Sequence, residues 1–154
     1  SCGGVDLSTI TNDQKYTGSD MKHVIENVSK VCYPDNKYIY LDFVNDDLSC
    51  IGEYNIVVLN AIIDICEKPL ELLSKLLKHA KKYVIIHRQE VPDIEIPGGY
   101  YLQKNPSYGG YTYQSFIERK LFDKILKENN FLIIKELDSG LGIYNNKSFL
   151  LKKN

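Results

Sequence analysis

Two runs of consecutive apolar residues, separated by a segment with helical spacing, constrain the fold of this chain more than any other feature. Residues 54–60 read YNIVVLN and residues 83–87 read YVIIH, with no strict alternation of apolar and polar side chains. Such runs are typical of parallel strands that are buried on both faces. Residues 69–80, which begin with a proline suited to a first helical turn, predict a helix between them. Strand, helix and strand in this order indicate an α/β sheet with parallel crossovers.

The rest of the chain extends the same alternation. Apolar residues at helical spacing predict helices over residues 21–31 and 116–128, and runs of strand-forming residues predict further strands. The last two strands are joined by a Gly-Leu-Gly turn at 140–142 and are expected to pair antiparallel. The predicted strands, besides the two above, cover residues 16–20, 37–43, 131–137 and 147–151.

Residues 89–112 break the alternation, because prolines and glycines recur in them. Tyrosines are also frequent there, and aromatic residues favour a functional segment over a disordered one. We therefore predict an irregular loop at 89–112 on the substrate side of the site. The breaking residues are Pro92, Pro97, Gly98, Gly99, Pro106, Gly109 and Gly110.

Polar and small residues stand where the predicted strands end, at the edge of an open α/β sheet where ligands bind. Glycines allow a close approach of the backbone, and a strand-end carboxylate can accept both hydroxyls of a ribose. Asp20 follows Gly4 by 16 residues, near the spacing of the dinucleotide fingerprint. The strand-end residues are Gly3, Gly4, Asp20, Asp42, Asn60, His87 and Arg88.

Taken in order, Gly3-Gly4, YTGSD at 16–20, YLDF at 40–43 and the stretch 54–86 resemble the class I S-adenosylmethionine (SAM)-dependent methyltransferases. The resemblance implies a Rossmann-like three-layer sandwich with a mostly parallel sheet, strand order 3-2-1-4-5-7-6 and a C-terminal antiparallel β-hairpin. It also implies one domain over residues 1–154, with the first strand largely missing. The segment RQEV at 88–91 is similar to a bacterial group of methyltransferase-like proteins.

The resemblance also implies a role for particular residues, with SAM as the cofactor. Asp20 would bind the ribose, and Asp42 would accept the adenine amino group beside the backbone of Phe43. Asn60 and Ala61 would flank the cofactor, while Gly3 and Gly4 would line its methionine part.

Two departures from the family pattern keep other interpretations open. Cys2 stands where the family has a glycine, and the acidic residue before the glycines lies outside this chain. A non-catalytic Rossmann-like domain with a degenerate cofactor site is one alternative, in which Asp20 caps a helix and Asp42 belongs to a turn. An NAD-dependent reductase or epimerase domain is another, opposed by the closing hairpin.

Side chains near the same edge are candidates for chemistry on the methyl acceptor, which we expect to be a small molecule or a glycan. His87 is the candidate general base, because histidine titrates near neutral pH. Arg88 can hold an anionic substrate, and Tyr108 and Tyr111 can form a substrate platform or lid. A structural role is the alternative for each of these residues.

Charge and cysteine content exclude several other classes. The net charge of -1 gives no support for nucleic-acid binding, which usually requires a basic excess. The four cysteines contain no CxxC pair, and the three histidines are scattered, so no metal site is expected and the thiols are expected to stay reduced. The longest apolar stretch, 56–65, is too short and too polar for a membrane span. We expect a cytoplasmic protein; its oligomeric state is left open.

Overall fold

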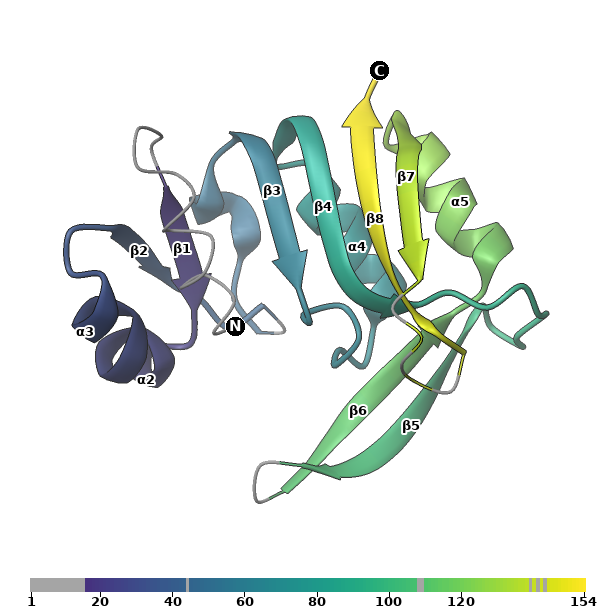
Figure 1. Cartoon of the computed structure of the whole chain (residues 1–154), viewed down its shortest axis with the longest axis horizontal. Helices are drawn as coiled ribbons and strands as arrows, with labels where there is room; N and C mark the ends of the chain where they lie inside the picture. The colour runs from purple at the N-terminus through teal and green to yellow at the C-terminus, as the bar shows by residue number, and fades with distance from the viewer. Residues whose placement is uncertain (1–15, 44, 108–109, 139, 141, 143) are drawn as a thin grey trace. The chain divides into compact units, whose positions relative to one another are not determined.

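The computed structural model describes residues 16–43, 45–107, 110–138, 140, 142 and 144–154 (Figure 1). Of residues 105–107 and 110–112 it describes the backbone. The chain divides into two compact units, residues 1–51 and residues 52–154, and each unit is considered by itself.

The first unit contains a parallel strand pair joined by a helical segment. β1 (Thr17–Asp20) pairs with β2 (Lys37–Tyr40), with Asp20 opposite Tyr40. The segment between them runs through α2 (Lys22–Val24), a π-helical turn η1 (Ile25–Ser29) and α3 (Lys30–Cys32), with Ile25 fully buried. A 3₁₀ turn, η2 (Leu48–Ile51), ends the unit. These elements confirm the strand–helix–strand order that the sequence predicts here.

The second unit is built on a mixed sheet whose central strand is β4 (Ala80–Glu90) (Figure 1). β3 (Tyr54–Asn60) runs parallel to β4 on one side, as predicted. β8 (Asn146–Lys153) runs antiparallel to β4 on the other side, and β7 (Phe131–Asp138) pairs antiparallel with β8. The antiparallel closing pair is therefore confirmed.

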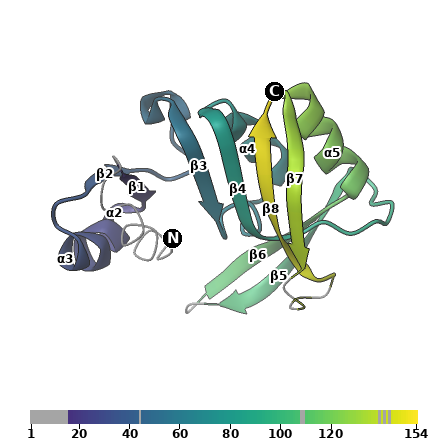
Figure 2. The ribbon, with the colours of Figure 1, turned by 45° about the horizontal axis from the view of Figure 1, so that its top comes forward.

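Two helices, α4 (Pro69–Leu77) and α5 (Arg119–Glu128), lie on one side of this sheet in both views (Figure 2). The core lies between these helices and the strands. The rings of Phe122 on α5 and Phe149 on β8 are 4.7 Å apart, and both are buried. Apolar side chains on other strand positions stay exposed, among them Ile56 on β3 and Ile134 on β7.

The helix expected over residues 69–80 is shorter than predicted. It ends at Leu77, because the N–H groups of Lys78 and His79 donate to carbonyls three residues earlier in a tight turn. The residues that follow, Lys81 and Lys82, are exposed residues of β4. Within the described residues, no helix has both the length and the apolar character that a bilayer crossing requires.

The largest difference from expectation is a long β-hairpin where residues 89–112 were predicted to be irregular. β5 (Tyr100–Ser107) pairs antiparallel with β6 (Gly110–Ile117) over eight residue pairs. The glycines mark its start: Gly98 and Gly99 have φ of 81° and 85°, which glycine adopts without steric cost. Phe116, expected at a helix start, is a buried residue of β6 and lies opposite Glu90 of β4.

The strand neighbours within each unit agree with the order 3-2-1-4-5-7-6. β2 and β1 correspond to strands 3 and 2, and β3, β4, β8 and β7 correspond to strands 4, 5, 7 and 6. The order across the two units, and the single domain that it implies, stay predictions.

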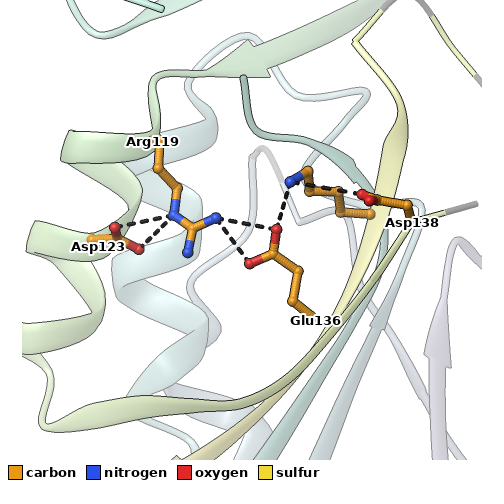
Figure 3. A network of polar contacts seen from close by, with 5 residues as sticks. Arg119, Asp123, Glu136 and Asp138 are labelled. Carbon is orange, nitrogen blue, oxygen red and sulfur yellow. Dashed lines mark hydrogen bonds and ion pairs between the residues drawn. The ribbon is translucent and has the colours of Figure 1, made fainter. Parts of the chain in front are cut away.

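A network of five charged side chains connects α5 to the closing strands, with Asp138 on β7 pairing with Lys147 at one end of it (Figure 3). The Arg119 guanidinium donates to Asp123 and, at 2.8 Å, to Glu136 on β7, while Lys147 on β8 donates to Glu136 as well. Burial alone would raise the pKa of Glu136, but the hydrogen bonds and positive charges of Lys147 and Arg119 outweigh it and lower the pKa below 4.5. The network stabilises the packing of α5 on this edge of the sheet.

Truncation of the core ring on β8 tests how much the helix layer contributes to stability. We expect Phe149→Ala to lower the free energy of unfolding by about 3–5 kcal/mol, because it removes buried contacts with Phe122 and leaves a cavity. Urea unfolding measures this loss. The matched control is Leu132→Ala on β7, whose side chain is exposed and should cost less than about 1 kcal/mol. Equal losses in the two variants would contradict the described core.

Replacement of Glu136 by glutamine tests the charged network and its pH dependence. At neutral pH, Glu136→Gln should lower the free energy of unfolding by about 1–2 kcal/mol, because Arg119 and Lys147 lose a shared carboxylate. Since the folded-state pKa lies below the unfolded one, this advantage is present above pH 4.5 and is lost as the pH falls through the folded-state pKa. Urea unfolding at several pH values measures it.

The control for this prediction is Glu128→Gln on the exposed face of α5. Its ion pair with Lys124 spans 3.8 Å between exposed side chains, so its loss should change stability by less than about 0.5 kcal/mol at any pH. A pH-independent difference between the wild type and Glu136→Gln would show that the network does not act through charge.

Candidate functional site

The carboxyl ends of β3 and β4 meet at two residues with left-handed backbone geometry. Asn60 lies opposite His87 in the parallel ladder, and the N–H of Ala61 donates to the His87 carbonyl at 3.2 Å. Ala61, directly after β3, and Arg88, two residues before the end of β4, have φ of 50° and 63°. Non-glycine residues with such angles cost about 1–3 kcal/mol each and cluster at active sites and ligand clamps. The predicted edge of the sheet is therefore a locally strained one.

A bulge in β4 accounts for the geometry at Arg88. The antiparallel register with β8 shifts between Ile86 and Gln89, so β4 has one extra residue at this point of the ladder. Before the bulge, Ile86 and its partner Phe149 are both buried, which places His87 and Ser148 on the other face of the sheet. After the bulge, Gln89 and Glu90 are buried. The bulge thus turns two polar side chains into the protein.

His87 and Arg88, the predicted base and substrate-binding residue, both lie exposed at this edge. Nδ1 of His87 is 2.8 Å from Oγ of Ser148 on β8, and this contact orients the ring. Arg88 makes no ion pair within 4 Å with any residue that the structure describes. Its guanidinium is therefore available to an anionic group.

The residues predicted to bind the nucleoside end of the cofactor lie in the first unit. Asp20 ends β1, and its Oδ1 accepts a hydrogen bond of 2.8 Å from the N–H of Met21 at the start of the helix. Phe43 is half-buried. Gly3 and Gly4, predicted to line the methionine part, lie outside the described residues.

Asp42 takes part in a turn rather than ending a strand, because β2 stops at Tyr40. Its Oδ2 accepts a hydrogen bond of 2.8 Å from Nδ2 of Asn45, and its own N–H donates to Asp46. The turn role that the sequence left open for Asp42 is therefore observed.

One of the two predicted substrate tyrosines belongs to the hairpin. Tyr111 is part of β6, where its backbone is described, and Tyr108 lies outside the described residues. Tyr113, two residues after Tyr111, lies near the loop before α4. The negative charge of Glu67 and a hydrogen bond to it raise the pKa of the Tyr113 hydroxyl. This contact links the hairpin to the segment that follows β3.

A buried polar cluster that the sequence analysis missed lies behind this edge. Ser115 of β6 is at its centre: its N–H donates to the Asp64 carbonyl at 2.7 Å, and its hydroxyl donates to the Ile63 carbonyl. Nε2 of Gln89 donates to the Ser115 carbonyl at 3.0 Å and to the Glu90 carbonyl. One serine therefore joins the β3–α4 loop, the end of β4 and the hairpin.

The carboxylate of Glu90 is enclosed and has its hydrogen bonds made. Oε1 accepts a hydrogen bond of 2.6 Å from Gln114 on β6, and Oε2 accepts one from the N–H of Tyr144. Gly142 lies so close that a Cβ there would be 2.4 Å from Oε1. Glycine is required at this point of the turn before β8.

Asp64 and Gln89 are different, because each keeps one buried acceptor that receives no hydrogen bond from the described residues. These atoms are Oδ1 of Asp64 and Oε1 of Gln89, in side chains that are 8% and 0% exposed. Burial raises the pKa of Asp64 to about 6; the positive charge of Arg88 opposes this shift and the negative charge of Glu90 adds to it. An acid within the apolar run 56–65 was the available signal for Asp64.

No protein-family model matches the chain, and no curated protein matches its sequence. Solved structures do match it. The magnesium protoporphyrin IX methyltransferase of Synechocystis PCC 6803, with bound S-adenosylhomocysteine (SAH), shares 16% identity at a TM-score of 0.68. That match covers 99% of this chain and 70% of the other.

Two further methyltransferase structures are similar. A SAM-dependent methyltransferase from Methanosarcina mazei is 12% identical, with a TM-score of 0.68 over 99% of this chain and 88% of that one. CalS10, a SAM-bound amino pentose methyltransferase from Micromonospora echinaspora, is 11% identical, with a TM-score of 0.63 over 98% and 80% of the two chains. The parallel pair β3–β4, the helix between them and the closing strands β7 and β8 thus make up the Rossmann-like α/β fold of class I SAM-dependent methyltransferases.

Proposed function

We propose that this protein binds SAM and transfers its methyl group to a small-molecule or glycan-type acceptor. The observation that carries this proposal is the pair of strained strand ends, Ala61 and Arg88, at the edge where ligands bind in open α/β sheets. The fold supports it, since similar structures contain SAM or SAH and include a porphyrin and an amino pentose methyltransferase.

The residues present fit this cofactor chemically. Asp20 ends β1 with a carboxylate that can accept ribose hydroxyls in addition to the Met21 N–H. Asp42 and the Phe43 backbone would hold the adenine. Asn60 and Ala61 would flank the cofactor, and the single methyl of Ala61 keeps its left-handed backbone accessible. Gly3 and Gly4 are proposed for the methionine part.

The chain's contribution to the reaction would be binding and orientation. When bound, SAM supplies the electrophilic methyl group. The protein holds the acceptor nucleophile in line with that group. His87 is proposed as the base for a nucleophile that carries a proton. Because Ser148 contacts its Nδ1, Nε2 is the ring nitrogen that would take the proton.

The acceptor would lie on the side of Arg88 and the hairpin. Arg88 would pair with an anionic group of the acceptor, and Tyr108 and Tyr111 would contact its rings. The segment 89–112 is then a substrate-side element whose strands β5 and β6 are paired in a fixed backbone register.

The turn at Asp42 favours one competing function, a Rossmann-like domain that has lost cofactor binding. In that case the role of the Asp42 carboxylate is to stabilise its own turn. The two functions differ in whether the protein binds SAH.

Calorimetric titration of SAH into the protein tests the proposal. We expect binding in the micromolar range, and we expect Asp20→Ala to weaken it at least about tenfold, because charged hydrogen bonds to the ribose contribute about 1.5–3 kcal/mol. The matched control is Asp35→Ala, which removes an exposed carboxylate of the same unit and should leave affinity unchanged.

Three outcomes would contradict the proposal. The absence of SAH binding by folded protein would support the degenerate domain. Binding of NAD without binding of SAH would support a reductase or epimerase. Equal SAH affinities of the wild type and Asp20→Ala would show that Asp20 does not bind the ribose.

A further inference from the structure

We propose that Asp64 and Gln89 bind the amino group of the methyl acceptor, so that the acceptor is an amine and the transfer is an N-methylation. The inference rests on the proposed function and names its substrate class. It depends on a feature of the second unit alone: two buried oxygen acceptors that no described residue satisfies, in two residues that are both hydrogen-bonded to Ser115 through other atoms.

The positions of the two acceptors follow from the strand ends. Asp64 lies in the loop after β3, three residues beyond Ala61, and Gln89 directly follows the bulge at Arg88. Both are hydrogen-bonded to Ser115 through other atoms. The pair therefore lies just inside the edge where the acceptor is expected. Ile65 is exposed, so the site is one residue from the surface.

The orientation of the Gln89 amide is determined by its neighbours. Nε2 faces two carbonyl oxygens, those of Glu90 and Ser115, and only an N–H group can satisfy both. A flipped amide would place two carbonyls against an oxygen. Oε1 is therefore the free end, and it is an acceptor.

Leaving these oxygens unsatisfied is costly, which is why a donor is expected there. A buried polar atom without a partner costs about 1–3 kcal/mol, and a charged one costs more. Proteins that retain such groups generally use them or fill them with water. A group that supplies N–H donors removes the penalty for both oxygens when it binds.

Charge and donor count favour an amine over a hydroxyl. A hydroxyl has one hydrogen to donate, whereas an amine has two, or three when it is protonated, so a single amino group can serve both acceptors. The Asp64 carboxylate lies in the fields of the buried Glu90 and the exposed Arg88. Two carboxylates against one guanidinium leave a negative excess, which favours a cationic ligand.

For an amine acceptor, Asp64 rather than His87 would take the proton. A protonated amine first gives one proton to the Asp64 carboxylate and so regains its lone pair, and the carboxyl passes that proton to solvent. The lone pair then forms the new C–N bond while the C–S bond of the cofactor breaks, and that bond's electron pair stays on sulfur. The methylated amine leaves as a cation. With a pKa of about 6, Asp64 is mostly ionised at neutral pH and can take this proton.

Carboxyl-carbon and side-chain amide NMR of the protein test this inference with methylammonium chloride as the probe. Methylammonium should lower the Asp64 pKa by about one pH unit, because a nearby cation favours the ionised carboxylate. It should also shift the Gln89 side-chain amide signals. Asp64→Asn should abolish the Gln89 shift, and Asp35→Asn, an exposed carboxylate, should preserve it.

Potassium chloride and methanol at matched concentration are the reference probes. An equal fall of the Asp64 pKa in potassium chloride would show that methylammonium acts only by ionic screening of the Asp64 carboxylate, and would overturn the inference. Equal Gln89 shifts in methanol would overturn the preference for an amine. If methylammonium does not shift the Gln89 signals, the inference is overturned and the two acceptors are hydrogen-bonded to water instead. The titration of the unchanged chain is decisive even if Asp64→Asn fails to fold. SAH binding without the amine effect would reject this inference alone, and the amine effect without SAH binding would reject the methyltransferase function.

Discussion

The hydrogen-bonding of β4 is the constraint on which the rest of the second unit depends. Its buried backbone must have partners on both edges, and β3 and β8 supply them over most of its length. Beyond the end of β3, β6 continues on the ladder at Glu90. The helices cover the face that carries Val84 and Ile86, so the apolar core forms only when β4 is paired. One strand thereby positions the core, the hairpin and the strained edge.

Two polar groupings of the second unit differ in whether their hydrogen bonds are made. Around Glu136, two cations and a carboxylate satisfy one another at a partly exposed edge, which is the arrangement of a stabilising contact. Around Ser115, Asp64 and Gln89 keep buried acceptors that no described residue serves. Buried acceptors without a hydrogen bond destabilise the fold, and natural proteins retain them mainly where a ligand or water supplies the donor. This contrast separates a structural network from a candidate binding site.

The bulge at His87 and Arg88 connects the fold to that candidate site. A regular strand alternates its side chains between two faces, and an inserted residue breaks that alternation. In β4, His87 remains exposed beside Ser148, while Gln89 and Glu90 turn into the protein. The strand ends therefore present an exposed imidazole and guanidinium on one side and buried acceptors on the other.

The sequence by itself determined the parallel pair β3–β4, the helix between them and the antiparallel closing strands, because apolar runs and helical spacing are local signals. Pro106, Gly98 and Gly99 indicated a loop, yet Pro106 is a paired residue of β5 and the two glycines directly precede that strand, in a hairpin whose pairing is set by contacts between distant residues. Only the tertiary structure decided the turn role of Asp42, the bulge at Arg88 and the burial of Asp64. All three depend on strand register and on the exclusion of water. The pKa of the Asp64 carboxyl, and the lack of a hydrogen-bond donor to its Oδ1 among the described residues, are set by neighbours far away in the chain.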